Sequence, residues 1–156
     1  MLPIGFYILK STFWGDFMNY FLISGGILSF CASALHLAII FGGPKWYIFF
    51  GAGEKMAQMA ARGHWYPPII TMFIAGILAV WGLYAFAGAG LVARLPFMRF
   101  CLVGISAVYL IRGTMPFLIM KTFPNLSLAF WLGSSAICVI IGLCYAIGTW
   151  KAWAAI

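Results

Sequence analysis

Acidic residues are nearly absent from this chain. Of its 156 residues only Asp16 and Glu54 are acidic, against nine basic residues, which gives a formal net charge of +7. Charged residues make up 7% of the chain and hydrophobic residues 65%, whereas about a quarter of the residues in a soluble domain are charged. This composition excludes an ordinary soluble domain, and the length predicts a single domain over residues 1–156.

The sequence contains four long apolar runs. A helix needs about 20 apolar residues to cross the roughly 30 Å hydrocarbon layer of a bilayer. Runs of that length cover residues 17–41, 68–89, 97–120 and 126–149. The sequence therefore predicts an all-α integral membrane protein with four transmembrane helices, whose first partner is the lipid bilayer.

The basic residues are scattered near the ends of the predicted helices and form no patch, which argues against a nucleic-acid partner. With four crossings the two sides carry equal numbers, namely Lys10, Arg94, Arg99 and Lys151 against Lys45, Lys55, Arg62 and Lys121. The positive-inside rule therefore gives no majority. We place both termini in the cytoplasm, because Arg94 and Arg99 bracket a tight loop without acids.

The first loop contains a predicted short helix at residues 54–62. Pro44 is expected to end the preceding helix, and no helix breaker follows Gly53 until Gly63. An apolar face follows from the i, i+3, i+4, i+7 spacing of Met56, Met59, Ala60 and Gly63. This pattern predicts an amphipathic helix at the membrane interface, with Glu54 in the first turn where the helix dipole favours an anion.

Four polar residues form the candidate ligand-binding site. His36 and Arg112 lie in the late parts of the first and third spans, which run in the same direction, so both belong to the leaflet of the first loop and Glu54. Tyr109 is about one turn from Arg112 on the same helix. Because an arginine inside a membrane costs about 3 kcal/mol on insertion scales, such residues usually face the bundle interior, a wet cavity or a partner.

Three classes of function remain open. The first is a protein that binds a small molecule, lipid group or ion at these residues, with Arg112 facing an anion, and that acts as a carrier if the pocket opens to both sides. The second is an accessory subunit of a larger membrane complex, or a homo-oligomer. The third is a redox protein with haem or metal on His36 and His64, a weak pair for either group. We favour binding over catalysis and leave the cofactor unassigned.

Small residues recur about one turn apart in the first span, at Gly25, Gly26, Ser29 and Ser33. They indicate close packing between helices of one chain, and a dimer interface is the second interpretation. The four cysteines lie inside spans without a C-x-x-C pair, which predicts buried thiols that act as small apolar side chains.

The order of several short motifs carries a resemblance. These motifs are Gly42-Gly-Pro, Gly51-Ala-Gly-Glu54, Arg62-Gly-His-Trp-Tyr-Pro67, Gly88-Ala-Gly, Arg94-Leu-Pro96 and Tyr109-Leu-Ile-Arg-Gly113. The chain resembles a group of small bacterial inner-membrane proteins of about this length with four spans. The resemblance covers most of the chain and implies the four-span architecture and a bacterial inner membrane. It brings no activity and no catalytic residues.

Overall fold

The structure is a computed structural model that describes residues 18–119 and 128–156. Helices and their connections account for all of this part of the chain, which contains no strand. The helices are α2 (Tyr20–Phe49), α3 (Glu54–Ala61), α4 (Tyr66–Gly88), α5 (Met98–Ile119) and α6 (Leu128–Ala152). Lys10, Asp16 and Lys121 lie outside the described residues, as do positions 17, 120 and 126–127 of the predicted spans.

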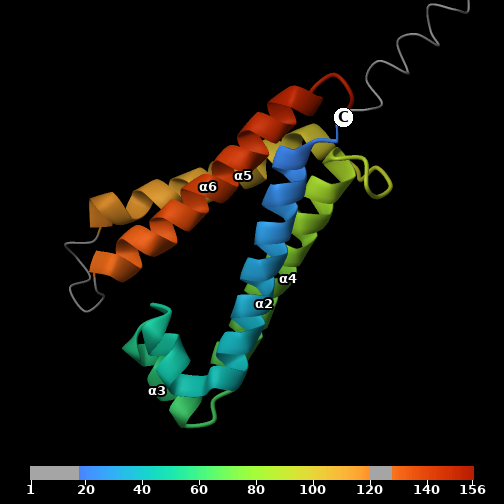
Figure 1. Ribbon diagram of the computed structural model, residues 1–156. Coiled ribbons are helices and arrows are strands. Elements are labelled where there is room, and N and C mark those ends of the chain that lie inside the picture. The colour runs from blue at the N-terminus through green and yellow to red at the C-terminus, as the bar shows by residue number, and fades with distance from the viewer. Residues whose placement is uncertain (1–17, 120–127) are drawn as a thin grey trace, which may run out of the picture.

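The four long helices form two hairpins. Helix α2 packs mainly against α4, and α5 packs mainly against α6. The hairpins meet where α2 and α5 begin and where α4 and α6 end, and they diverge towards their other ends (Figure 1). We call the meeting region the joined end and the diverging region the splayed end. Helix α3 lies at the splayed end, against α2 and α4.

The predicted spans agree with the four long helices, each of which is long and apolar enough to cross a membrane. Proline residues Pro67 and Pro68 stand in the first turn of α4, where a missing backbone N–H leaves no hydrogen bond unmade. At the other end of α4, Gly90 adopts a φ of 78°. The amides of Gly90 and Leu91 donate back to the carbonyls of Ala87 and Phe86, which is the Schellman arrangement that ends many helices.

The first helical segment ends where Pro44 predicted. The helical backbone of α2 is interrupted at Gly43, whose φ of 67° and ψ of −156° suit glycine alone. Pro44 then begins a second helical segment that runs to Phe49, where its fixed φ is favourable and its N–H is not needed. Pro44 therefore blocks continuation of the first helix, as predicted, whereas the segment that follows it was not predicted.

Helix α3 begins at Glu54, as predicted, and most of the predicted apolar face packs, with Ala57 added and Gly63 left out. Ala57 is buried against Ile39 and Tyr47 of α2, with Met56 and Ala60 beside it. The predicted face extended to Gly63, which is instead exposed, adopts a φ of 69° and follows the last helical turn. The kinked end of α2 curves beneath α3 and selects the face that contains Ala57. A position of α3 at the membrane interface stays a prediction.

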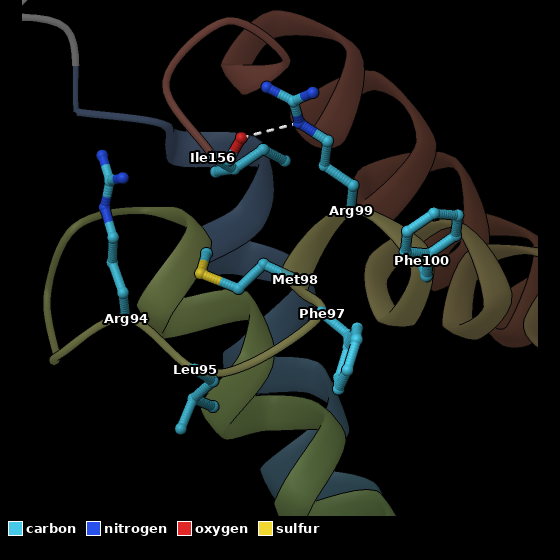
Figure 2. Close-up of a pocket in the computed structure, with 7 residues that line it drawn as sticks. All are labelled: Arg94, Leu95, Phe97, Met98, Arg99, Phe100 and Ile156. Atoms are coloured by element: carbon cyan, nitrogen blue, oxygen red, sulfur yellow. Dashed lines mark hydrogen bonds between the residues drawn. The ribbon is translucent and has the colours of Figure 1, made fainter.

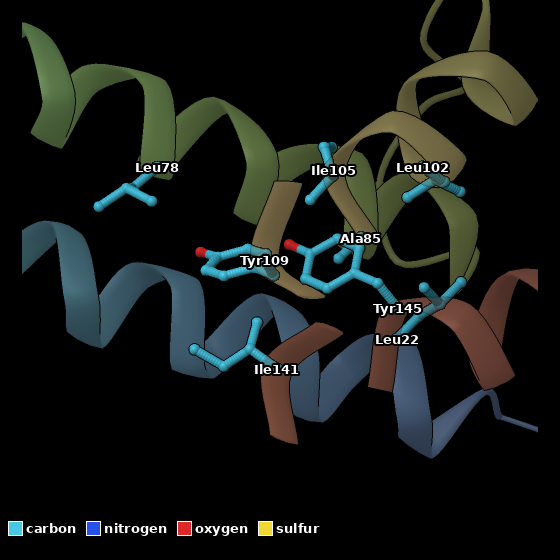
Figure 3. Close-up of a cluster of buried hydrophobic side chains, with 8 residues drawn as sticks. All are labelled: Leu22, Leu78, Ala85, Leu102, Ile105, Tyr109, Ile141 and Tyr145. Atoms are coloured by element: carbon cyan, nitrogen blue, oxygen red, sulfur yellow. The ribbon is translucent and has the colours of Figure 1, made fainter. Parts of the chain in front are cut away.

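Small residues bring the four helices together at the joined end. Leu22 of α2 is fully buried, and a Cβ built on Gly88 or Gly148 would stand 2.8 Å or 2.6 Å from its side chain. Leu102 of α5 completes this contact from the fourth helix, since it lies 3.0 Å from the same point on Gly88. Figure 3 shows the buried cluster that continues from Leu22 into the bundle.

The small-residue stripe of α2 serves helix packing, as predicted. A Cβ on Gly26 would stand 2.7 Å from the Phe86 ring of α4, and one on Gly25 would stand 3.0 Å from the Tyr145 ring of α6. The cysteine prediction was partly wrong, because Cys31 is exposed on the surface of α2, while Cys101, Cys138 and Cys144 are half-buried. All four thiols are free.

Candidate functional site

The four predicted ligand-binding residues lie in different environments. His36 is half-buried in α2, Glu54 is exposed at the start of α3, and Arg112 is exposed on α5. Tyr109 is buried, with 5% of its surface exposed, although it is only three residues from Arg112. The two side chains of α5 therefore lie in different surroundings, the tyrosine in the core and the arginine on the surface.

No polar contact joins these residues in the described part of the chain. His36 makes one hydrogen bond, from Nδ1 to the carbonyl oxygen of Ala32 at 2.8 Å. A carbonyl oxygen can only accept, so Nδ1 carries a proton and donates it. Within the described residues, Glu54 and Arg112 make no side-chain hydrogen bond or ion pair. His36, Glu54 and Arg112 therefore lie towards the splayed end without polar contact between them.

The second histidine stands apart from the first. His64 lies in the exposed connection between α3 and α4, where its Nδ1 accepts from the Tyr66 amide at 3.2 Å. Its ring stacks on Trp65 with 5.7 Å between centroids. Within residues 18–119 and 128–156, no three His, Cys, Asp or Glu side chains gather as a set of metal ligands.

The polar centre of the molecule is a buried hydroxyl cluster that the sequence did not predict. Ser29 Oγ of α2 lies 3.0 Å from the hydroxyl of Tyr109 on α5 and 3.0 Å from that of Tyr145 on α6. The Tyr145 hydroxyl donates to the carbonyl oxygen of Trp81 on α4 at 2.9 Å. One residue from each spanning helix therefore takes part, and we call this set the hydroxyl cluster.

The direction of its hydrogen bonds follows from the number of protons. Each hydroxyl has one proton, and that of Tyr145 goes to the Trp81 carbonyl, which can only accept. Ser29 must then donate to Tyr145, and Tyr109 must donate to Ser29. This order, from Tyr109 through Ser29 and Tyr145 to Trp81, uses every proton once and leaves no donor free.

Aromatic contacts hold the cluster in place. The Tyr109 and Tyr145 rings stack with 5.8 Å between centroids, and the Trp81 ring meets Tyr109 edge-on at 5.2 Å. Figure 3 shows the two tyrosines side by side among the buried apolar residues. Such an enclosed and fully bonded cluster can fix the relative rotation of four helices. Its geometry suits a structural role, because every hydroxyl proton is already bonded inside the core.

Within the described residues, three buried polar atoms of α6 have no hydrogen-bond partner, of which those of Trp131 and Ser135 lie towards the splayed end and Thr149 Oγ1 towards the joined end. A Cβ built on Gly113 would stand 3.1 Å from the carbonyl oxygen of Ser135, which sets Ser135 at the level of Arg112. Ser135 Oγ is buried without a hydrogen-bond partner, and so is Nε1 of Trp131, one turn nearer the splayed end. Buried polar groups normally have partners, so these unmatched atoms are unusual.

These features define the class of protein, a helical membrane protein built from four apolar helices long enough to span the bilayer. No protein-family model, curated protein or solved structure matches the chain. The resemblance drawn from the short motifs therefore stays a prediction.

Proposed function

We propose that this protein is a non-catalytic binding protein of the bacterial inner membrane, and that its ligand is an amphipathic molecule with an anionic group. The ligand would bind at the splayed end, with its anionic group on Arg112 and its apolar part against the diverging hairpins. Both termini would lie in the cytoplasm, so the splayed end would belong to the opposite leaflet.

The observation that carries the proposal is the unpaired Arg112. It stands about 21 Å along α5 from Met98 at about 1.5 Å per residue, well inside a helix of spanning length. It is exposed and has no hydrogen bond or ion pair in the described part of the chain. Since an unpaired arginine in a bilayer costs about 3 kcal/mol, an anion that pairs with it gains a large part of that free energy.

Two further donors support an anionic ligand over a neutral one. The hydroxyl of Ser135 and the indole N–H of Trp131 are both buried and unmatched on the neighbouring helix α6. Both atoms are out of contact with solvent, so a ligand would reach them only if the α5 and α6 hairpin opened, and an anionic oxygen would then be the best acceptor for their protons. Glu54 and His36 have no contact with Arg112 here, so the proposal rests on the α5 and α6 hairpin alone.

Decyl phosphate is a suitable probe, because it combines an anionic head with an apolar tail. We expect it to bind the protein in phosphatidylcholine nanodiscs and to raise the thermal unfolding temperature. Arg112→Gln should weaken this binding by about 10-fold to 100-fold, the range for a hydrogen bond to a charged group. Arg112→Lys keeps the charge and should retain part of the affinity.

A matched control separates the site from general charge effects. Arg62 is exposed in the α3 to α4 connection and makes no side-chain hydrogen bond to any residue that the structure describes. Arg62→Gln removes the same charge at the same end and should leave binding of decyl phosphate unchanged. Equal binding by the Arg112→Gln protein and the control would disprove the proposed site.

A second candidate is an accessory subunit whose splayed end receives a helix of another protein. It is favoured by the divergence of the hairpins and by the low burial of the spans, at 28–33% of the most apolar stretch of each helix. In this case a partner's carboxylate would pair with Arg112. The decyl phosphate experiment distinguishes the two, because a protein-docking site would show no Arg112-dependent binding of the probe.

A further inference from the structure

The joined end carries a pocket that the proposed ligand site does not use. It lies between the α4 to α5 connection and the last described residue, and its volume is about 280 Å³. Its lining comprises Arg94, Leu95, Phe97, Met98, Arg99, Phe100 and Ile156. Figure 2 shows these residues around the beginning of α5.

Two arginines give this pocket its charge. Arg94 donates one N–H to the Ala155 carbonyl at 2.6 Å, and Arg99 donates one to Ile156 at 2.7 Å. Each guanidinium has five N–H donors, so most of them make no hydrogen bond within residues 18–119 and 128–156. In Figure 2 the two guanidinium groups extend to the same side of the loop, with Ile156 between them.

No acidic side chain balances this charge in the described part of the chain. The single described acid, Glu54, lies at the splayed end. Lys151, in the last turn of α6, adds a further positive charge at the joined end, where its ammonium lies 4.6 Å from the Phe21 ring. The arginines are also held in place, since Arg99 stacks over Trp153 at 5.3 Å. Two fixed and exposed guanidinium groups therefore border the pocket, with no acidic side chain beside them in the described part of the chain.

Apolar rings stand next to these donors. Phe97 and Phe100 are 76% and 81% exposed, and in Figure 2 they point away from the guanidinium groups. Phe97 has a φ of 54° and is the one non-glycine residue with positive φ in the described part of the chain. Such a conformation costs about 1–2 kcal/mol in an L-residue, and here it places an aromatic ring on the surface at the start of α5.

We propose that this pocket binds the phosphate of an anionic phospholipid, with the acyl chains against Phe97 and Phe100. A phosphate oxygen pair matches the two-pronged donor geometry of a guanidinium. The two arginines lie at the ends of spanning helices, which is the level of the headgroups, and the adjoining rings suit the boundary between headgroup and hydrocarbon. A free phosphate ion would use the arginines but would leave both rings without a function.

The test uses the full-length protein in nanodiscs that mix phosphatidylcholine with phosphatidylglycerol, followed by native mass spectrometry of the released protein. We expect phosphatidylglycerol to remain bound in preference to phosphatidylcholine. The double variant Arg94→Gln/Arg99→Gln should lose this preference by about 10-fold or more, as expected for charge-assisted hydrogen bonds. The double variant Arg94→Lys/Arg99→Lys should retain part of the preference. Retention by this variant would show that the two positions tolerate substitution without unfolding of the protein.

The control Lys45→Gln/Arg62→Gln removes the same charge from two exposed residues at the splayed end and should keep the lipid preference. Equal retention by the Arg94→Gln/Arg99→Gln protein and this control would overturn the proposal. Glycerol phosphate added to pure phosphatidylcholine nanodiscs should bind at least 10-fold more weakly than the lipid. Equal binding would assign the pocket to a soluble anion instead. Arg112→Gln should retain the lipid, so this inference and the proposed function can fail separately.

Discussion

At the joined end all four long helices contact one another, whereas at the splayed end each hairpin packs within itself. Hydrogen bonds between the hairpins, in the described part of the chain, lie at the hydroxyl cluster or closer to the joined end. Beyond the cluster the hydrogen bonds stay inside one hairpin, as between Ser33 and the Ala75 carbonyl at 2.8 Å. The same helices thus form a packed region and an open one.

The two ends also differ in how their polar groups are satisfied. Asn19 caps α2 by accepting from the Leu22 amide and donates to the Gly148 carbonyl at 2.7 Å, so one side chain connects two helices. Towards the splayed end, Arg112 has no hydrogen bond or ion pair within the described residues, and Ser135 Oγ and Trp131 Nε1 are buried without a partner. Thr149 Oγ1 near the joined end is buried without a partner as well, so the clearest difference between the ends is the exposed, unpaired Arg112.

The largest effect should come from added volume at the joined end. In Gly148→Ala the new Cβ would stand 2.6 Å from the Leu22 side chain and 3.0 Å from its backbone nitrogen, so α2 and α6 must separate. We expect a loss of about 3 kcal/mol in the free energy of unfolding, the upper range for an overfilled core. Unfolding in mixed detergent micelles measures the loss.

Gly133 is the matched control, because it lies on the same helix and nothing stands within 4 Å of its Cβ position. Gly133→Ala should be neutral or should gain up to about 1 kcal/mol from helix propensity. A similar loss for both variants would show that the joined end is not closely packed.

The hydroxyl cluster should give the next largest effect. Ser29→Ala removes two hydrogen bonds of about 1 kcal/mol each, so we expect a loss of about 2 kcal/mol in the free energy of unfolding. Ser24, exposed on the same helix, supplies the control Ser24→Ala, which should have little effect.

The proton order within the cluster sharpens this prediction. Tyr145→Phe leaves two hydroxyl protons for a single remaining bond, whereas Tyr109→Phe removes a donor and leaves every other proton bonded. The loss of stability should therefore be larger for Tyr145→Phe than for Tyr109→Phe. The reverse ranking would contradict the order from Tyr109 through Ser29 to Tyr145.

A smaller and local effect is expected at the kink of α2. Gly43→Ala places an L-residue at a φ of 67° and should cost about 1–2 kcal/mol. Because Gly43 precedes the segment that packs on α3, amide hydrogen exchange should become faster in Glu54–Ala61 and stay unchanged at the joined end. Gly76→Ala on α4, with open space around its Cβ position, is the control. Faster exchange at both ends would show that they are not independent.

The smallest effect concerns the pair Glu54 and Arg112. Neither makes an ion pair in the described part of the chain, so the effects of Glu54→Ala and Arg112→Ala on stability should add to within about 0.5 kcal/mol. A thermodynamic cycle of the two single variants and the double variant measures the coupling. A coupling of several times that size would mean that α3 closes onto α5 in the membrane.

Much of the fold could be predicted from the sequence, because a helix long enough to cross a membrane requires a long run of apolar residues. The runs located α4, α5 and α6, and the small residues Gly25 and Gly26 correctly indicated close packing. The continuation of α2 beyond Pro44 could not be seen, because Gly43 permits a kink where proline alone suggests an end.

The candidate site was less predictable, because it depends on how helices rotate and diverge. The direction of each span predicted that His36, Glu54 and Arg112 lie in one leaflet. How far apart the two hairpins lie within that leaflet cannot be predicted from the sequence. Tyr109 was chosen for its distance from Arg112, yet its hydroxyl faces Ser29. Tyr145 resembles any other aromatic residue of a span, so its place in the hydroxyl cluster follows only from the packing of four helices.

Distances between spin labels test the difference between the two ends most directly. In a protein without its four cysteines, one label pair at Ser24 and Val103 reports the joined end, and another at Leu35 and Met115 reports the splayed end. All four positions are exposed and lie about one and a half turns from Ser29 or Tyr109 on α2 and α5. We predict a short, narrow distance for the first pair and a longer one for the second. Equal distances would show that the hairpins run parallel and would contradict the account.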